Sequence, residues 1–281
     1  MQHEKYLLVS FRTSKWSARK FDAKATEEVA ANHNATGDIG RFNKLLLNKG
    51  DINPVNAAFA AARRQHDALT LPWDDDGDRL LPSARLMDYR SKMQPHLSEV
   101  DSRVAYLLGR YQDLINARRV ELNGLFDPAD YPSEQQIREK FAHKIEIKPV
   151  PASEAIRFGD PNIERDLREQ YEEMLKERVD DAQREVWYRL IEPIKRLVDV
   201  LTRDGRVYET THKAILDVAR LVPQYNINGD PKLDKAASDI YALMSKVNVE
   251  ILRDSEAIRN ITAEAASDIL SRMDSKYAGA F

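Results

Sequence analysis

The stretch that decides the fold class is residues 160–202, DPNIERDLREQYEEMLKERVDDAQREVWYRLIEPIKRLVDVLT. Asp160 followed by Pro161 predicts a helix start, because aspartate caps free backbone N–H groups and proline fits the first turn. Apolar residues then recur every three or four positions, which is typical of one buried helix face. That face comprises Ile163, Leu167, Tyr171, Met174, Val179, Ala182, Val186, Leu190, Ile194, Leu197 and Leu201. The stretch therefore predicts a long helix to Thr202, kinked at Pro193.

Such a helix would extend on the order of 60 Å at 1.5 Å per residue, more than the diameter of a compact domain. We therefore expect it to pair with another long helix or with a partner subunit. Residues 83–122 are the candidate within the chain, because they carry a second apolar stripe with helical spacing. Its members are Leu97, Val100, Val104, Leu107, Tyr111, Leu114 and Ile115.

Further helices are predicted where capping or turn residues precede helical patterns. The expected ranges are 25–33, 41–47, 53–69 (from Asn53-Pro54), 133–141 (from Ser133 with Gln136), 208–221, 230–244 and 247–277, with a break near 254–260 and a turn at Asp204-Gly205.

Two stretches predict strands. Lys5–Arg12 is rich in β-forming residues, and Lys144–Lys148 alternates between charged and apolar side chains. Because a single strand leaves its backbone groups unpaired, the second stretch needs a partner, either Tyr6–Phe11 or Ile156–Phe158. The predicted fold class is mainly α with a small antiparallel β-sheet (α+β), built on a long-helix bundle or a coiled-coil-like helix pair. Residues 1–159 and 160–281 form its two regions, expected to be one continuous fold.

The composition excludes several classes of protein. With 32% charged and 42% hydrophobic residues, the chain is predicted to be globular rather than disordered. The absence of cysteine excludes disulfides, thiolate zinc sites and cysteine nucleophiles. No apolar run approaches the roughly 20 residues that span a bilayer, and no secretion signal is evident. The six histidines lack metal-ligand spacing, and no phosphate-binding glycine loop occurs. We expect neither enzymatic activity nor a cofactor.

The net charge of −3 is unevenly distributed. Residues 1–70 carry eleven Lys/Arg against seven Asp/Glu, a balance of +4. Residues 160–200 carry eight against twelve, a balance of −4. A basic N-terminal part with an acidic helix is compatible with an anionic ligand bound at one place.

The stretch Leu71–Pro82, LPWDDDGDRLLP, contains four aspartates around one glycine. With Gly77 at position six of a calcium loop, position one is Pro72 and position twelve is Ser83, so neither end supplies a carboxylate. A magnesium-binding carboxylate pair lacks an accompanying phosphate-binding loop. The stretch is better explained as an acidic turn in which Trp73 reaches the core and aspartates accept bonds from turn amides. We expect it to form the corner between the 53–69 and 83–122 helices.

Basic and aromatic residues interleave in two N-terminal stretches, 12–24 and 41–44. Single-stranded nucleic acid is bound by such surfaces, where cations follow the backbone and bases stack on rings. The simpler alternative is that Trp16 and Phe21 belong to the core and the cations line a solvated face. Both interpretations stay open at this point.

The motifs also resemble a family of largely uncharacterised helical proteins of phages and mobile elements. The resemblance rests on Trp16–Lys20, Gly40–Lys44, Leu71–Gly77 with Leu81-Pro82, Phe126, Asp130–Pro132, Lys140-Phe141 and Pro149–Pro151, and covers residues 6–158. In size and character the chain is similar to the ssDNA-binding RNA polymerase cofactors of phages related to coliphage N-four. This resemblance implies a cytoplasmic protein of the infected host cell that binds melted promoters and recruits the phage RNA polymerase.

The leading hypothesis is therefore a phage ssDNA-binding transcription cofactor, expected to be a homo-oligomer. Its expected DNA contacts are Lys15, Trp16, Arg19, Lys20, Arg41, Phe42, Lys44, Arg63, Arg64, Trp73 and Arg79. One alternative is a non-catalytic structural adaptor of a phage or mobile-element ATPase complex. Another is a metal-dependent enzyme that uses Asp74, Asp76 and Asp78.

Overall fold

The computed structural model describes residues 5–37, 40–153, 156–157, 159–203 and 207–273. The fold is mainly α-helical with a small antiparallel sheet, as predicted. The chain divides into two compact units. Unit 1 comprises residues 1–9, 70–86 and 147–281, and unit 2 comprises residues 10–69 and 87–146. These boundaries differ from the expected regions 1–159 and 160–281, because apolar residues of two early stretches lie in one core with the C-terminal helices.

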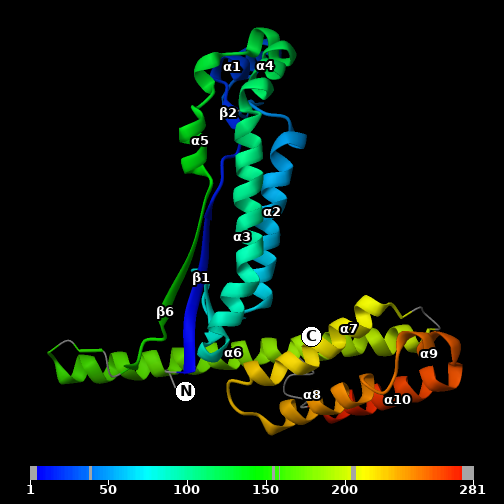
Figure 1. Cartoon of the computed structure of the whole chain (residues 1–281). Helices are drawn as coiled ribbons and strands as arrows, with labels where there is room; N and C mark the ends of the chain where they lie inside the picture. The colour runs from blue at the N-terminus through cyan, green and yellow to red at the C-terminus, as the bar shows by residue number, and fades with distance from the viewer. Residues whose placement is uncertain (1–4, 38–39, 154–155, 158, 204–206, 274–281) are drawn as a thin grey trace. The chain divides into compact units, whose positions relative to one another are not determined.

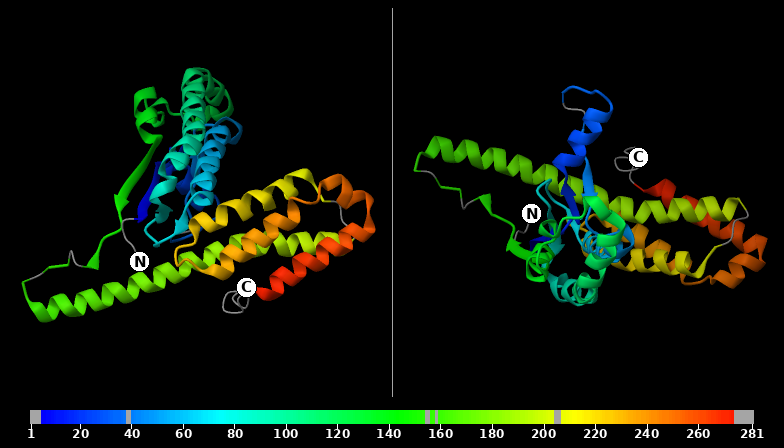
Figure 2. Two further views of the ribbon diagram at one scale, coloured as in Figure 1. Left: turned by 60° about the horizontal axis from the view of Figure 1, so that its bottom comes forward. Right: turned by 90° about the horizontal axis from the view of Figure 1, so that it is seen from above.

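Unit 1 is a helical bundle around the long helix α6 (Figures 1 and 2). Its helices are α6 (Pro161–Thr202), α7 (Glu209–Leu221), η6 (Val222–Tyr225), α8 (Pro231–Met244), α9 (Val249–Asp254) and α10 (Glu256–Arg272). Helix α6 packs against α10 and α7, and α8 packs against α7 and α10. Trp187, fully buried on α6, lies in the core of the bundle.

Helix α6 has the predicted limits and a different partner. Asp160 caps it by accepting a bond from Asn162 N at 2.9 Å, and Pro193 lies inside it. Its helix partner is α10, not residues 83–122. The residues of the predicted apolar stripe are buried only from Ala182 onward, and Ile163 is 51% exposed. The prediction that this face is buried was wrong for the first turns of α6. Helical spacing shows which residues share a face but not whether another element covers that face.

Unit 2 contains the helices α2 and α3, which run side by side (Figures 1 and 2). Its helices are α1 (Ala23–Asn32), α2 (Lys49–Ala68), α3 (Leu86–Gly109), α4 (Tyr111–Leu122), η3 (Asn123–Leu125), η4 (Pro128–Asp130) and α5 (Glu134–Lys140). The predicted stripe of 97–115 is continuous across a helix break at Arg110, and five of its seven residues are buried. Residues 83–122 are thus two α-helices, preceded by the 3-10 turn η2 (Ser83–Arg85), rather than one helix.

Two other helix predictions for this unit were wrong. Helix α2 begins at Lys49, not at Asn53-Pro54, because Ile52 already lies on its buried face. Pro54 therefore lies inside the helix, where it cannot donate the backbone bond of its position. Residues 41–47 contain the strand β3 (Asn43–Leu45), not a helix. In contrast, the capping box of Ser133 and Gln136 begins α5 as predicted.

The main sheet has the strand order β4-β5-β1-β6. Its strands are β1 (Tyr6–Ser14), β4 (Leu71–Pro72), β5 (Asp78–Pro82) and β6 (Ala142–Pro149). Strand β6 neighbours β1, so the predicted strand 144–148 has the first of its two expected partners. A separate ribbon pairs β2 (Arg19–Phe21) with β3. Phe158, the turn at Asp204-Gly205 and the last residues of the predicted tail helix lie outside the described residues.

None of the described helices is both long and apolar enough to cross a membrane. Each unit has its own hydrophobic core. The core of unit 1 joins Leu8, Leu71, Trp73 and Leu80 to the helices α6–α10, and that of unit 2 joins Phe11 and Trp16 to α2–α5.

Candidate nucleic-acid interface

The β2–β3 ribbon of unit 2 brings the two basic-aromatic stretches together. Its antiparallel register sets Arg19 opposite Leu45, Lys20 opposite Lys44, and Phe21 opposite Asn43. Bonds beyond both ends extend the pairing, from Leu46 N to Ala18 O at 2.8 Å and from Asp22 N to Phe42 O at 3.0 Å. Residues more than twenty positions apart thus form one surface element.

The exposed cationic and aromatic side chains of this ribbon and its extension are Arg19, Lys20, Phe21, Arg41 and Phe42. We call them the ribbon surface. Phe21 is 47% exposed and Phe42 is 39% exposed, although burying a phenylalanine side chain would stabilise the folded protein. The guanidinium Cζ of Arg41 lies 5.9 Å from the centre of the Phe21 ring, within the range of a cation–π contact. The ribbon surface therefore offers both cations and accessible aromatic rings.

Four residues of this surface were predicted DNA contacts, and Phe21 was not. The sequence allowed Phe21 to be a core residue, because a strand of three residues is too short to show which of its faces other elements cover. The pairing of β2 with β3 shows which side chains share a face, since side chains two apart on a strand point to the same side. Phe21 therefore lies on the same side as Arg19.

Lys44, also a predicted DNA contact, is buried and neutralised within unit 2. Its Nζ lies 3.1 Å from Asp22 Oδ2 and 2.6 Å from Asp130 Oδ2, and donates to Leu125 O at 2.8 Å. Burial lowers the pKa of Lys44, but bonds to Asp130 and Asp22 outweigh it and the net pKa lies above its ordinary value. Because its charge has two carboxylate partners, Lys44 fastens the ribbon to the 125–130 segment rather than facing a ligand.

Trp16 is not an available stacking face. It is 6% exposed and meets the Tyr111 ring edge-on, with centroids 6.0 Å apart and an interplanar angle of 81°. Burial raises the pKa of Tyr111, whose hydroxyl donates to Pro132 O at 3.0 Å. Trp16 is thus a core residue, which is the simpler alternative that its sequence context allowed.

The remaining predicted contacts of unit 2 lie on β1–β2 and α2. Lys15 is exposed with its Nζ 5.9 Å from the centre of the Phe59 ring, and Arg64 is exposed on α2. Arg63 donates to Phe11 O and lies over the Phe11 ring at 4.8 Å, so its head group is held at β1. Lys15 and Arg64 remain candidates for contacts, whereas Arg63 is already bound within the protein.

Trp73 and Arg79, two further predicted DNA contacts, belong to unit 1, where Trp73 is buried and Arg79 is half-buried. Trp73 is 7% exposed in the unit 1 core, with Arg178 Cζ 5.7 Å from its ring. Arg79 donates to Thr70 through Nε at 2.7 Å and through Nη2 at 3.2 Å. Trp73 thus packs with β4, β5 and α6 rather than at the expected corner between the 53–69 and 83–122 helices.

The acidic stretch is the turn of the β4–β5 hairpin. Asp74 Oδ1 accepts from Asp78 N at 2.9 Å, and Asp74 Oδ2 lies 3.4 Å from Arg178 Nη1. Asp78 pairs with Lys148, and Gly77 adopts φ +93°, a conformation that glycine accepts readily. Among the described residues no group of three or more His, Asp or Glu could hold a metal ion. Asp74 therefore stabilises the turn through the Asp78 amide, and both Asp74 and Asp78 have a cation partner within the protein.

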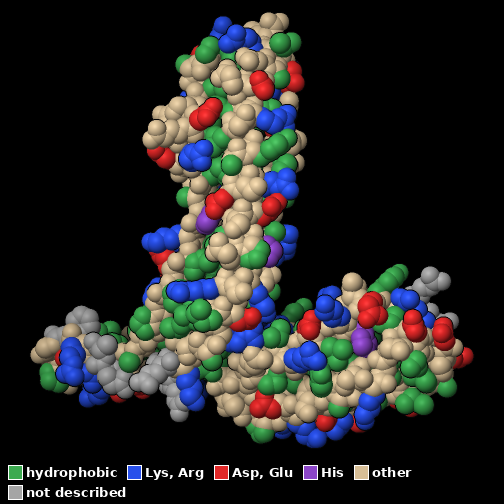
Figure 3. Space-filling model, viewed as in Figure 1, with side chains coloured by type: hydrophobic (Ala, Val, Ile, Leu, Met, Phe, Trp, Pro, Cys, Tyr) green, Lys and Arg blue, Asp and Glu red, His purple; other side chains and the backbone are tan. Residues whose placement is uncertain are grey.

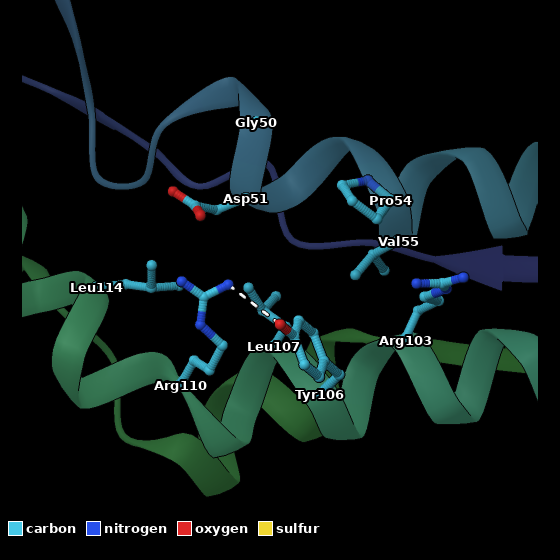
Figure 4. A pocket seen from close by; sticks show the side chains of 9 residues that line it. All are labelled: Gly50, Asp51, Pro54, Val55, Arg103, Tyr106, Leu107, Arg110 and Leu114. Atoms are coloured by element: carbon cyan, nitrogen blue, oxygen red, sulfur yellow. Dashed lines mark hydrogen bonds between the residues drawn. The ribbon is translucent and has the colours of Figure 1, made fainter.

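A second cation–aromatic pair lines a small pocket between α2 and α3–α4 (Figure 4). Tyr106 is 63% exposed and Arg110 lies over it, with Cζ 5.5 Å from the ring centre. The pocket has a volume of about 70 Å³, and the Asp51 side chain also lines it. Its other cation, Arg103, pairs with Glu99 at 2.6 Å. Charge here is balanced by nearby carboxylates, so the pocket is a weaker anion site than the ribbon surface.

The two units differ in formal charge. Unit 2 has nineteen Lys/Arg against sixteen Asp/Glu, or +3, and unit 1 has twenty-four against thirty, or −6. In the space-filling view, acidic and basic side chains intermix both over α7–α10 and at the end of unit 2 that carries α1 and α4, so the difference lies in the totals (Figure 3). The electrostatic preference for an anion therefore lies with unit 2.

No protein-family model, no curated protein and no solved structure matches the chain. The family resemblance of its motifs therefore stays a prediction.

Proposed function

We propose that the protein binds single-stranded DNA through the ribbon surface, without catalysis. The observation that carries this proposal is the exposure of Phe21 on the same face of the ribbon as Arg19, with Arg41 over the Phe21 ring. Lys20 and Phe42 are exposed at register positions of the other face. Cations that follow a phosphate backbone and rings on which bases stack are the two parts of a sequence-tolerant ssDNA site.

The charge distribution supports the same surface. Within the ribbon, the neighbouring carboxylate of Asp22 is paired with Lys44, so it does not neutralise Arg19, Lys20 or Arg41. The excess of cations in unit 2 attracts a polyanion, whereas the excess of carboxylates in unit 1 repels one.

Salt-dependent binding tests the proposal. Fluorescence anisotropy with labelled (dT)20 would be measured over a range of NaCl concentrations, for the protein and for the R19Q/K20Q/R41Q variant. Each phosphate contact on single strands contributes about 0.7 to the slope of log K against log salt, so the triple variant is expected to lose a slope of about 2. Duplex DNA of the same length should bind more weakly.

The matched control is R90Q/R103Q/R110Q, which removes three exposed cations of unit 2 outside the ribbon, including the two that line the Tyr106 pocket. This variant should keep most of the slope and the affinity. If both variants lose affinity equally, binding depends on overall charge rather than on the ribbon. Absence of ssDNA binding at low salt would refute the proposal and favour the structural adaptor of an ATPase complex.

The proposal includes a role as a transcription cofactor of the infected cell's cytoplasm, which rests on the motif resemblance. The protein, as a homo-oligomer, would hold melted promoter DNA and recruit the phage RNA polymerase. In vitro transcription with that polymerase on a pre-melted promoter tests this part, and stimulation should disappear in R19Q/K20Q/R41Q. Equal transcription with and without the protein would contradict the cofactor role while leaving ssDNA binding intact.

A further inference from the structure

A cavity of about 240 Å³ lies beside the ribbon surface in unit 2. It is lined by Thr26 and Val29 of α1 and by the segment Gly40, Arg41 and Phe42. Val29 is 46% exposed and Phe42 is 39% exposed, so two apolar side chains border an open space. The Arg41 guanidinium is the cation of the lining.

The two sides of this cavity are fixed to each other by hydrogen bonds. Thr26 Oγ1 donates to Asp22 O at 2.7 Å and accepts from Phe42 N at 3.0 Å. Asp22 N also donates to Phe42 O at 3.0 Å. The backbone of Phe42 is therefore tied to α1 through both its N–H and its carbonyl, and the cavity is formed before any ligand enters.

We propose that this cavity receives one unpaired base of the bound single strand. The inference rests on the proposed function and specifies which part of the single strand the protein contacts besides the phosphates, namely a base. A volume of 240 Å³ is below the roughly 300–1,000 Å³ of pockets for drug-sized ligands, and suits a flat group such as one base. Phe42 supplies a ring face and Val29 an aliphatic wall, both suited to a base plane.

Arg41 connects the cavity to the rest of the ribbon surface. Its side chain lines the cavity and its guanidinium lies over the Phe21 ring, so one cation serves two neighbouring aromatic sites. A phosphate at Arg41 would thus lie between a base in the cavity and a base at Phe21. Paired bases are stacked inside a duplex and enter such a cavity only after costly extrusion, so the cavity selects single strands.

Abasic oligonucleotides test this inference separately from backbone binding. The probes are labelled (dT)12 and a 12-mer of the same charge whose sugars carry no bases. The wild-type protein is expected to bind (dT)12 about five- to 100-fold more tightly than the abasic 12-mer, from stacking of individual bases. Equal affinities would overturn the base site while leaving phosphate binding by the ribbon intact.

Variants then separate the cavity from Phe21. V29W fills the cavity from an exposed helix position, so the fold should survive, as circular dichroism would verify. It should weaken binding of (dT)12 about five-fold or more and leave the abasic 12-mer unchanged. R41Q should weaken both probes. If V29W weakens both probes equally, or neither, the cavity does not hold a base. If (dT)12 does not bind the wild-type protein at all, the proposed function itself fails.

Discussion

Two short antiparallel ribbons in this protein look alike in sequence and differ in structure. The β2–β3 ribbon carries Phe21 with Arg41, and the β4–β5 hairpin carries Trp73 with Arg79. Phe21 is 47% exposed, whereas Trp73 is 7% exposed. Arg79 donates to Thr70, whereas Arg41 lies over an accessible ring. Aromatic and basic composition therefore does not distinguish a binding surface from a structural corner. Whether the aromatic ring is exposed or buried depends on the residues that pack around each ribbon.

The strongest test of this contrast exchanges the two aromatic rings for alanine. W73A is expected to lower the free energy of unfolding by about 3–5 kcal/mol, because it empties a core site between the hairpin and α6. F21A should change stability by less than about 0.5 kcal/mol at its exposed position. Urea denaturation measures both values.

DNA binding should show the opposite order. F21A should weaken ssDNA binding by about 1–3 kcal/mol, while folded W73A binds as the wild-type protein does. A destabilising F21A, or a W73A that folds normally yet loses DNA affinity, would contradict the assignment of the two ribbons.

The next effect concerns two lysines that face each other across the β2–β3 ribbon. K44M removes the partner of two carboxylates and of Leu125 O, and is expected to lower stability by about 1–3 kcal/mol. Lys20 is paired with Lys44 in the register but is exposed, so K20M should change stability by less than about 0.5 kcal/mol.

Thermal or urea unfolding of both variants checks the difference. K44M/D130N, which also removes one stranded charge, should regain part of the loss. Equal stability of K44M and K20M would show that the ion pairs do not hold the ribbon.

A smaller effect is expected on the pH dependence of stability. The bond from Ala25 N and the contact with Lys44 lower the pKa of Asp22 below its ordinary 3.8. A carboxyl with a lowered pKa in the folded state stabilises above its unfolded pKa, and this contribution is lost as the pH falls through the folded value. The protein should therefore lose stability below about pH 4 more steeply than D22N, which retains a helix-capping residue.

Unfolding at pH 7, 5, 4 and 3 provides the comparison. Glu121, whose pKa is lowered by bonds from Arg118 and Asn48, contributes in the same direction in both proteins. Parallel stability curves for wild type and D22N would show that Asp22 is not linked to folding.

Local signals in the sequence predicted much of the helical fold. Asp160, Ser133 and Asp230 each precede a helix start and each caps it, because a capping side chain acts within three residues. The partners of these helices were not predicted, since α6, which ends at Thr202, packs on α10, which begins only at Glu256.

The candidate site was predicted only in part, for a related reason. Arg19, Lys20, Arg41 and Phe42 were named, and the ribbon that joins them was not, because residues 41–47 have a helical pattern and their strand partner is far away in sequence. Trp16 and Lys44 have the same composition around them as the exposed residues. Their burial depends on Tyr111 and Asp130, which lie more than eighty residues away.

The interleaving of the two units has a consequence for how this protein can be shortened. The chain enters unit 2 twice, at residues 10 and 87, and returns to unit 1 each time. A chain shortened to begin or end anywhere between residues 70 and 86 lacks one of the two pieces of unit 2 and part of unit 1. Nascent chains released before residue 146 contain neither unit whole.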